Sequence, residues 1–191
     1  MNRFRFLLVF LLLPFALGAC GSSQEAASCS NDDDLCPPGC APESDNDCGE
    51  LQWQDPPAES AMTWQEAIDY CESLSEDGFS DWHLPNIDEL RSLIRGCSDT
   101  ETEGSCAIDG DCLSHDDCWN DPCIGCLELE GPANGCYWRE DLQGACDCYW
   151  SSSLREDGNV GRWGVFFTFG RVNNYFKDNP YSVRCVRRVI L

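Results

Sequence analysis

The residues best suited to chemistry crowd into one stretch of the chain, residues 97–148. This stretch holds thirteen acidic side chains against Arg139 alone, together with nine cysteines. Carboxylate oxygens are the ligands that calcium prefers in proteins. We therefore predict calcium ligands among five aspartates of the stretch: Asp109, Asp111, Asp116, Asp117 and Asp121. The alternative is a solvated acidic loop whose shape comes from its disulfides.

Two tryptophans of the same stretch, Trp119 and Trp138, are candidates for ligand binding. A partly exposed indole ring can stack on a sugar or anchor a protein partner, and packing over a disulfide is the alternative. The tripeptide Trp119-Asn120-Asp121 matches one by which calcium-dependent lectins hold calcium and sugar hydroxyls. It lies outside any β-rich segment and lacks the partner motif of those lectins, so we assign no sugar site to it.

The chain offers little support for catalysis. It contains no nucleophile elbow, HExxH motif or phosphate-binding loop, and nothing positions a base beside the serines 151–153. His83 is expected to be structural. His115, beside Asp116, is expected to be an exposed loop residue, with a metal ligand as the alternative. We expect a protein that is not an enzyme.

Local signals predict the elements that must position these residues. Thr63 and Glu66 form a capping-box pattern before an apolar stripe, which predicts a helix over 64–74. Asn86 predicts the start of a second helix over 87–95. Aromatic and β-branched runs at 149–150, 162–172 and 181–190 predict strands. The fold class is therefore α+β, with two helices, then an antiparallel sheet. Residues 97–148 have almost no apolar period and are predicted to be a long exposed insertion, held by disulfides rather than by burial.

The N-terminus predicts export. Two arginines precede an apolar run over 6–17, too short to span a bilayer but typical of a signal peptide. Leu17-Gly18-Ala19-Cys20 resembles the lipobox of bacterial lipoproteins. This implies a signal peptide over 1–19, lipid such as palmitate on Cys20, and a membrane anchor. An ordinary signal peptide is the alternative. The absence of aspartate after Cys20 resembles an outer-membrane address. Residues 20–50 are predicted to form an acidic, cysteine-rich stalk.

Charge and cysteine content agree with a location in the cell envelope. The formal net charge of −22 should repel nucleic acid and anionic lipid. Sixteen cysteines in an exported chain imply disulfides. Lipid on Cys20 would leave fifteen, an odd number, so at least one cysteine needs another explanation.

Several segments, taken in order, resemble the Lcl C-terminal domain family: MTWQEAI from Met62, GFSDWHLP from Gly78, YWSS from Tyr149 and VRCVR from Val183. The resemblance covers 51–96 and 149–191, leaves 97–148 outside, and makes 51–191 one domain. It implies a C-type-lectin-like fold, which joins both chain ends in one sheet, and a Cys71–Cys185 disulfide. His83 stands where the family has arginine, so an ion pair made by that arginine would be missing or weakened.

The resemblance and the predicted anchor together imply a non-catalytic surface protein that binds an extracellular glycan or protein. A disulfide-hardened structural envelope protein without a small ligand is the alternative. Some members of the family resemble adhesins for sulfated polysaccharides. Such a ligand would require one face to gather five arginines: Arg162, Arg171, Arg184, Arg187 and Arg188.

Overall fold

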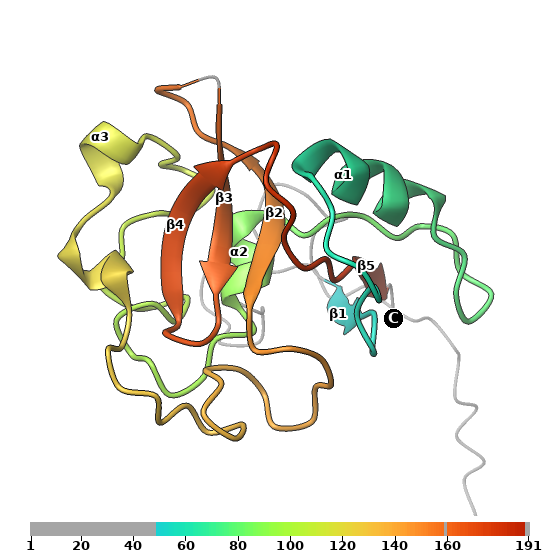
Figure 1. Cartoon of the computed structure of the whole chain (residues 1–191), viewed down its shortest axis with the longest axis horizontal. Coiled ribbons are helices and arrows are strands. Elements are labelled where there is room, and N and C mark those ends of the chain that lie inside the picture. Colours follow the sequence, from blue (N-terminus) through green and yellow to red (C-terminus); the bar gives the residue numbers. More distant parts are fainter. Residues whose placement is uncertain (1–48, 159, 190–191) are drawn as a thin grey trace, which may run out of the picture.

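The computed structural model describes residues 49–158 and 160–189, and it combines short helices with two antiparallel sheets (Figure 1). The α+β prediction is confirmed at this level. One sheet pairs β1 (Glu50–Trp53) with β5 (Val186–Val189). The other has the order β2-β3-β4, from β2 (Cys148–Leu154), β3 (Gly161–Phe166) and β4 (Arg171–Phe176). The helices are α1 (Trp64–Ser73), α2 (Ile87–Arg91), α3 (His115–Cys118) and the 3-10 helix η1 (Asp121–Ile124).

Both predicted helices begin at their predicted caps. The Glu66 carboxylate accepts a 2.9 Å hydrogen bond from the backbone N–H of Thr63, and α1 ends at Ser73. Asn86 caps α2 by accepting from the N–H of Glu89 at 2.8 Å. The second helix is shorter than predicted, because the chain beyond Arg91 continues in tight turns and Ile94 pairs with residue 138 of the insertion.

The run 162–172 is not one strand. It forms β3 and the first residues of β4, separated by a turn in which Gly170 adopts a φ of +58°. A positive φ is open to glycine without steric cost. The predicted third run, 181–190, contributes only the short β5. Its first part lies beside β2, where Ser182 forms an isolated β-bridge with Tyr149.

The hydrophobic core has two parts. One packs α1 against Trp150 and the segment before β5. The other lies between the three-stranded sheet and α2, and it includes Ile108, Tyr137 and Trp138 of the insertion. The prediction that residues 97–148 are held by disulfides rather than by burial is therefore wrong about burial, because this stretch contributes side chains to the core. Single apolar side chains, spaced irregularly along an irregular backbone, are buried one at a time and leave no period in the sequence.

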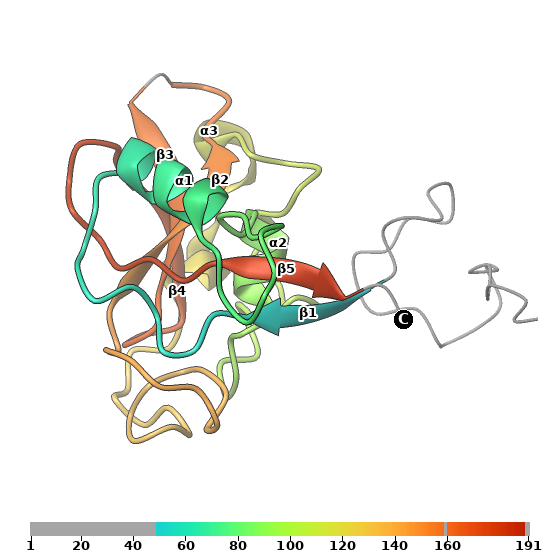
Figure 2. The ribbon, with the colours of Figure 1, turned by 90° about the vertical axis from the view of Figure 1, so that its right-hand side faces the viewer.

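The two ends of the described domain meet in one sheet. β1 and β5 pair antiparallel from Glu50 opposite Val189 to Trp53 opposite Val186 (Figure 2). Cys71 on α1 and Cys185 beside β5 form a disulfide with a Cα–Cα distance of 5.5 Å, the pairing that the family resemblance implies. No helix among the described residues is long and apolar enough to cross a membrane.

Disulfides hold the insertion as predicted. Four lie within it and join Cys97 to Cys126, Cys106 to Cys123, Cys112 to Cys118 and Cys136 to Cys146. Among the described cysteines, Cys148 is the one outside a disulfide, and burial raises the pKa of its thiol. The signal peptide, Cys20 and the cysteines of the stalk lie outside the described residues.

Candidate functional site

The aspartates predicted to bind calcium do not share one set of partners. Asp109 accepts 3.0 Å hydrogen bonds from the N–H groups of Asp111 and Cys112. Asp117 accepts from the Ser114 hydroxyl at 2.9 Å, and Asp121 begins η1. Within residues 49–158 and 160–189, no three His, Cys, Asp or Glu side chains gather where they could hold a metal ion. Calcium binding stays a prediction, without an assembled ligand set to support it.

Asp116 belongs to an ion-pair network between α3 and the β2–β3 connection. Arg155 pairs with Asp157 and, at 3.3 Å, with Asp116. Asp157 also accepts from the N–H of Asp116 at 2.7 Å and from the Ser114 hydroxyl at 3.3 Å. The hydrogen bond from Arg155 lowers the pKa of the Asp157 carboxyl. These two carboxylates therefore share one arginine of the protein as their partner.

Trp138 is not a surface residue. Only 3% of it is exposed, so the prediction of a ligand-stacking ring is wrong. Its ring centroid lies 5.7 Å from that of Tyr149 and 5.3 Å from that of Phe167, and the Arg184 guanidinium lies 5.3 Å from it. Burial of its large apolar ring in the core explains its presence without a ligand.

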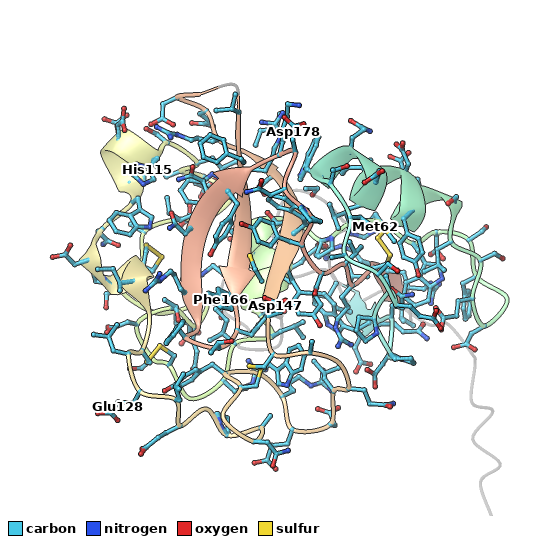
Figure 3. All side chains as sticks on the ribbon, in the orientation of Figure 1. Met62, His115, Glu128, Asp147, Phe166 and Asp178 are labelled. Atoms are coloured by element: carbon cyan, nitrogen blue, oxygen red, sulfur yellow. A yellow bond between two sulfur atoms is a disulfide. The ribbon has the colours of Figure 1, made fainter. Side chains whose placement is uncertain are left out.

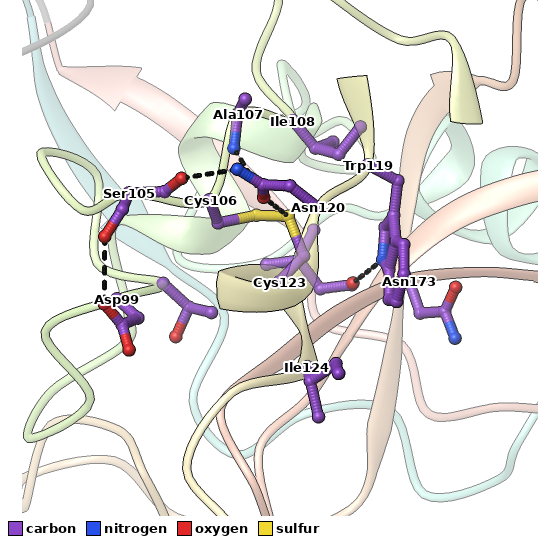
Figure 4. Close-up of a disulfide and its surroundings, with 12 residues drawn as sticks. Asp99, Ser105, Cys106, Ala107, Ile108, Trp119, Asn120, Cys123, Ile124 and Asn173 are labelled. Atoms are coloured by element: carbon purple, nitrogen blue, oxygen red, sulfur yellow. Dashed lines mark hydrogen bonds between the residues drawn. A yellow bond between two sulfur atoms is a disulfide. The ribbon is translucent and has the colours of Figure 1, made fainter. Parts of the chain in front are cut away.

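Trp119 is half-buried and held at one edge. Its indole N–H donates to the carbonyl of Val172 at 3.0 Å, and its ring stacks on His115 with centroids 5.2 Å apart. The amide of Asn120 turns inward, where it donates to the carbonyl of Ser105 at 2.9 Å (Figure 4). The amide that lectins of the matching tripeptide use for calcium and sugar therefore serves the loop itself here. His115 is half-buried and not an open loop residue.

This part of the insertion covers the edge of the three-stranded sheet. β4 is the outer strand, and residues 119–126 run along it. The N–H of Cys126 donates to the carbonyl of Phe169 at 2.8 Å, and the Arg171 guanidinium donates to that of Ile124 at 3.0 Å. Uncovered strand edges invite pairing with other chains. The insertion therefore shields the β4 edge of the sheet from pairing with other chains, and it also forms part of the protein surface.

The five arginines do not form one cationic face. Arg184 is 1% exposed and Arg187 is 7% exposed. Arg184 donates to the Gln54 carbonyl at 2.7 Å and to Asp55 at 3.0 Å, whereas Arg187 pairs with Asp81 at 2.7 Å. Arg184 and Arg187 therefore do not contribute to the cationic face that a sulfated polysaccharide would require.

Where the family has arginine, His83 makes a polar contact with an acidic side chain, and the weakening of an arginine ion pair stays a prediction. The ring of His83 lies 3.2 Å from the carboxylate of Glu89, and Arg188 lies 3.0 Å from the same carboxylate. His83 also exchanges two backbone hydrogen bonds with Val186 at 2.9 Å. Its role is structural, and the arginine on β5 supplies the charge that histidine lacks when neutral.

Two of the three serines considered as nucleophiles have hydroxyl groups that are engaged in the fold. The Ser151 hydroxyl donates to the carbonyl of Trp163 at 2.8 Å, and that of Ser153 accepts from the N–H of Ile87 at 3.0 Å. The thiol of Cys148 is buried, and its raised pKa keeps it protonated at neutral pH. A thiol must ionise to act as a nucleophile.

What the surface does offer is a set of large apolar side chains in solvent. The most exposed are Leu127 at 73%, Phe176 at 67%, Leu129 at 64%, Val160 at 53% and Leu154 at 48%. Sequence reasoning missed all of them. In the insertion the available signal was the alternation of leucine and glutamate from Leu127 to Glu130, which matches no helical period and sits among turn residues.

Comparison with known proteins agrees with the geometry of the domain. No curated protein matches the chain. The model of the Lcl C-terminal domain family matches residues 44–187, more than half of the chain, and the matched range runs through the insertion that the resemblance had left outside. The chain therefore belongs to the Lcl C-terminal domain family.

Proposed function

We propose that this protein is a non-catalytic recognition lipoprotein of the bacterial cell envelope, which binds an extracellular protein or glycan. The observation that carries the proposal is the set of exposed apolar side chains, led by Leu127, Phe176 and Leu129. Contiguous exposed apolar side chains mark interaction sites, and Leu127 and Leu129 lie two positions apart on one segment of the insertion. Serine and cysteine side chains already engaged in the fold support a non-catalytic role.

A rigid frame favours recognition. Four disulfides in the insertion and the contacts of residues 119–126 with β4 restrict the motion of the insertion, which carries Leu127 and Leu129. Binding by an already ordered surface loses less conformational entropy than binding by a mobile one. The pairing of both ends of the described domain in β1 and β5, with a long loop between distant elements, supports a C-type-lectin-like arrangement.

The placement of the chain ends also favours recognition. β1 and β5 lie at one end of the domain, and the loops of the insertion reach away from them (Figure 2). In Figure 3, Glu128 lies at the edge of the molecule remote from Met62. A lipid on Cys20, most simply in the outer membrane, would tether the domain through the end that carries β1. The insertion would then face outward.

The alternative, a structural envelope protein without a ligand, is favoured by the same disulfides and by the covered edge of β4. An array of extracellular proteins and glycans, probed with the purified chain, separates the two. Recognition predicts saturable binding to a defined class of probe, with or without calcium. If the chain binds no protein and no glycan of the array, and calcium does not shift its melting temperature, the structural role would be favoured.

A further inference from the structure

The segment Leu127–Glu130 carries the strongest unexplained feature of the surface. Leu127 and Leu129 are 73% and 64% exposed, and neither belongs to the two core clusters. We propose that this segment is a docking site for a partner protein whose surface offers an apolar pocket ringed by lysine or arginine. The inference rests on the proposed recognition function and names its site and the chemistry of its partner.

The start of the segment is fixed to the domain. Cys126 is joined to Cys97 by a disulfide, and its N–H donates to the carbonyl of Phe169 at 2.8 Å. The hydroxyl of Tyr137, a residue that is 4% exposed, donates to the carbonyl of Glu128 at 2.7 Å. A buried side chain therefore holds the backbone midway between the two leucines.

The end of the segment is fixed as well. The chain reverses over residues 131–136, where the N–H of Gly135 donates to the carbonyl of Gly131 at 2.9 Å. Cys136, at the close of this turn, is joined to Cys146 by a disulfide. Both ends of the segment and its middle are therefore fixed to the domain, and this keeps the two leucine side chains in solvent. A partner would meet a surface that is already ordered.

Charge selects the kind of partner. Glu128 and Glu130 flank Leu129, both are exposed, and neither forms an ion pair among the described residues. Carboxylates around an apolar contact favour basic groups on the partner and reject like charge. A second copy of this chain, with its net charge of −22, and an anionic membrane are therefore disfavoured. Leucine also lacks the flat ring that stacks on sugars.

The test uses the purified full chain and a fluorescent amphipathic peptide that places leucine on one face and lysine on the other. Control peptides replace lysine by glutamate, or leucine by serine. We expect binding to the leucine–lysine peptide alone, with methyl NMR shifts at Leu127 and Leu129. The double variant Leu127→Ser/Leu129→Ser should weaken it roughly tenfold or more. Glu128→Gln/Glu130→Gln should weaken it several-fold and reduce its dependence on salt.

The matched control is Leu154→Ser, which removes an exposed leucine at the end of β2 and should leave affinity unchanged. Equal losses in Leu154→Ser and the double variant would overturn the inference, and so would an absence of binding by the wild-type chain. Equal binding to neutral phosphatidylcholine vesicles, or self-association that the double variant abolishes, would also overturn it. Array binding that survives the double variant would leave the recognition function standing and remove only this site.

Discussion

Glu89 occupies the third position of α2, where its carboxylate closes the capping box and also meets two basic side chains. It accepts from the N–H of Asn86 at 2.9 Å and lies beside His83 and Arg188. Burial raises the pKa of Glu89, but the hydrogen bonds from His83 and Asn86 outweigh it, and the net shift is downward. The ionised form is therefore the one that stabilises the fold.

This shift predicts a pH dependence of stability. A carboxyl with a lowered pKa contributes stability above its ordinary pKa of 4.5, and loses it as the pH falls through that value toward the folded pKa. Glu89→Gln should lower the free energy of unfolding by roughly 1–3 kcal/mol at pH 7. The difference from the wild type should shrink between pH 5 and pH 3, roughly the range in which a carboxyl titrates. Urea denaturation across that range measures it.

The sequence contains a matched control, because Glu66 holds the same capping position in α1. Its pKa is also lowered, by hydrogen bonds from Thr63, but its carboxylate lies fully in solvent. Glu66→Gln should therefore cost less stability than Glu89→Gln. An equal effect of the two substitutions would show that capping alone, and not the contacts with His83 and Arg188, accounts for the contribution of Glu89.

At the scale of elements, α2 holds the first loop of the insertion through Arg91. This side chain is 2% exposed, and it donates to the carbonyls of Thr100 at 3.1 Å, of Glu101 at 2.8 Å and of Ile108. Burial lowers the pKa of Arg91, and the charges of Asp88 and Asp109 oppose this. Three carbonyls of irregular backbone thus depend on one guanidinium, a role that sequence reasoning missed.

Arg91→Met should destabilise the protein by roughly 3–5 kcal/mol, because it leaves the buried carbonyls without donors. Chemical denaturation gives the loss, and limited proteolysis should show earlier cleavage within 98–110. Arg95→Met is the control, since Arg95 is exposed and bonds only to Ser92 and Ile94 in its own turn. Its cost should stay within about 0.5 kcal/mol. Comparable losses in both variants would refute a clamping role for Arg91.

At the scale of the molecule, the Cys71–Cys185 disulfide closes the domain. It joins α1 to the segment before β5 across 114 positions of sequence, and both cysteines are fully buried. Beside it, β1 and β5 bring the two ends of the described domain together. A cross-link across so long a loop removes much of the conformational freedom of the unfolded chain.

Cys71→Ala/Cys185→Ala should lower the free energy of unfolding by about 5 kcal/mol through loop entropy. Cys136→Ala/Cys146→Ala, which opens a bridge across 10 positions, should cost about 3 kcal/mol on the same scale. Calorimetry under non-reducing conditions compares the two. A smaller loss for the long bridge than for the short one would contradict the entropic account of the domain's stability.

Local signals in the sequence determined where the helices begin and which segments favour strands. Thr63 and Glu66, or Asn86 and Glu89, act across three residues, so their hydrogen bonds are legible without the rest of the chain. The pairing of Cys71 with Cys185 followed from resemblance to a family, since sixteen cysteines permit many pairings. Clustering of aspartates along the sequence did not determine which of them meet in space, because Asp109 bonds the backbone of its own turn, whereas Asp116 pairs with Arg155 and Asp117 bonds Ser114.

Only the tertiary structure decided which side chains of the insertion are buried, which cover the sheet and which remain in solvent. The burial of Trp138, the cover over β4 and the inward turn of Arg184 all depend on partners 11 to 130 positions away. Such contacts leave no period in the sequence, because each irregular segment contributes one side chain at a time. The exposure of Leu127 and Leu129 was decided in the same way, since their alternation with glutamate is visible in the sequence but only the fold shows that neither side chain packs inward.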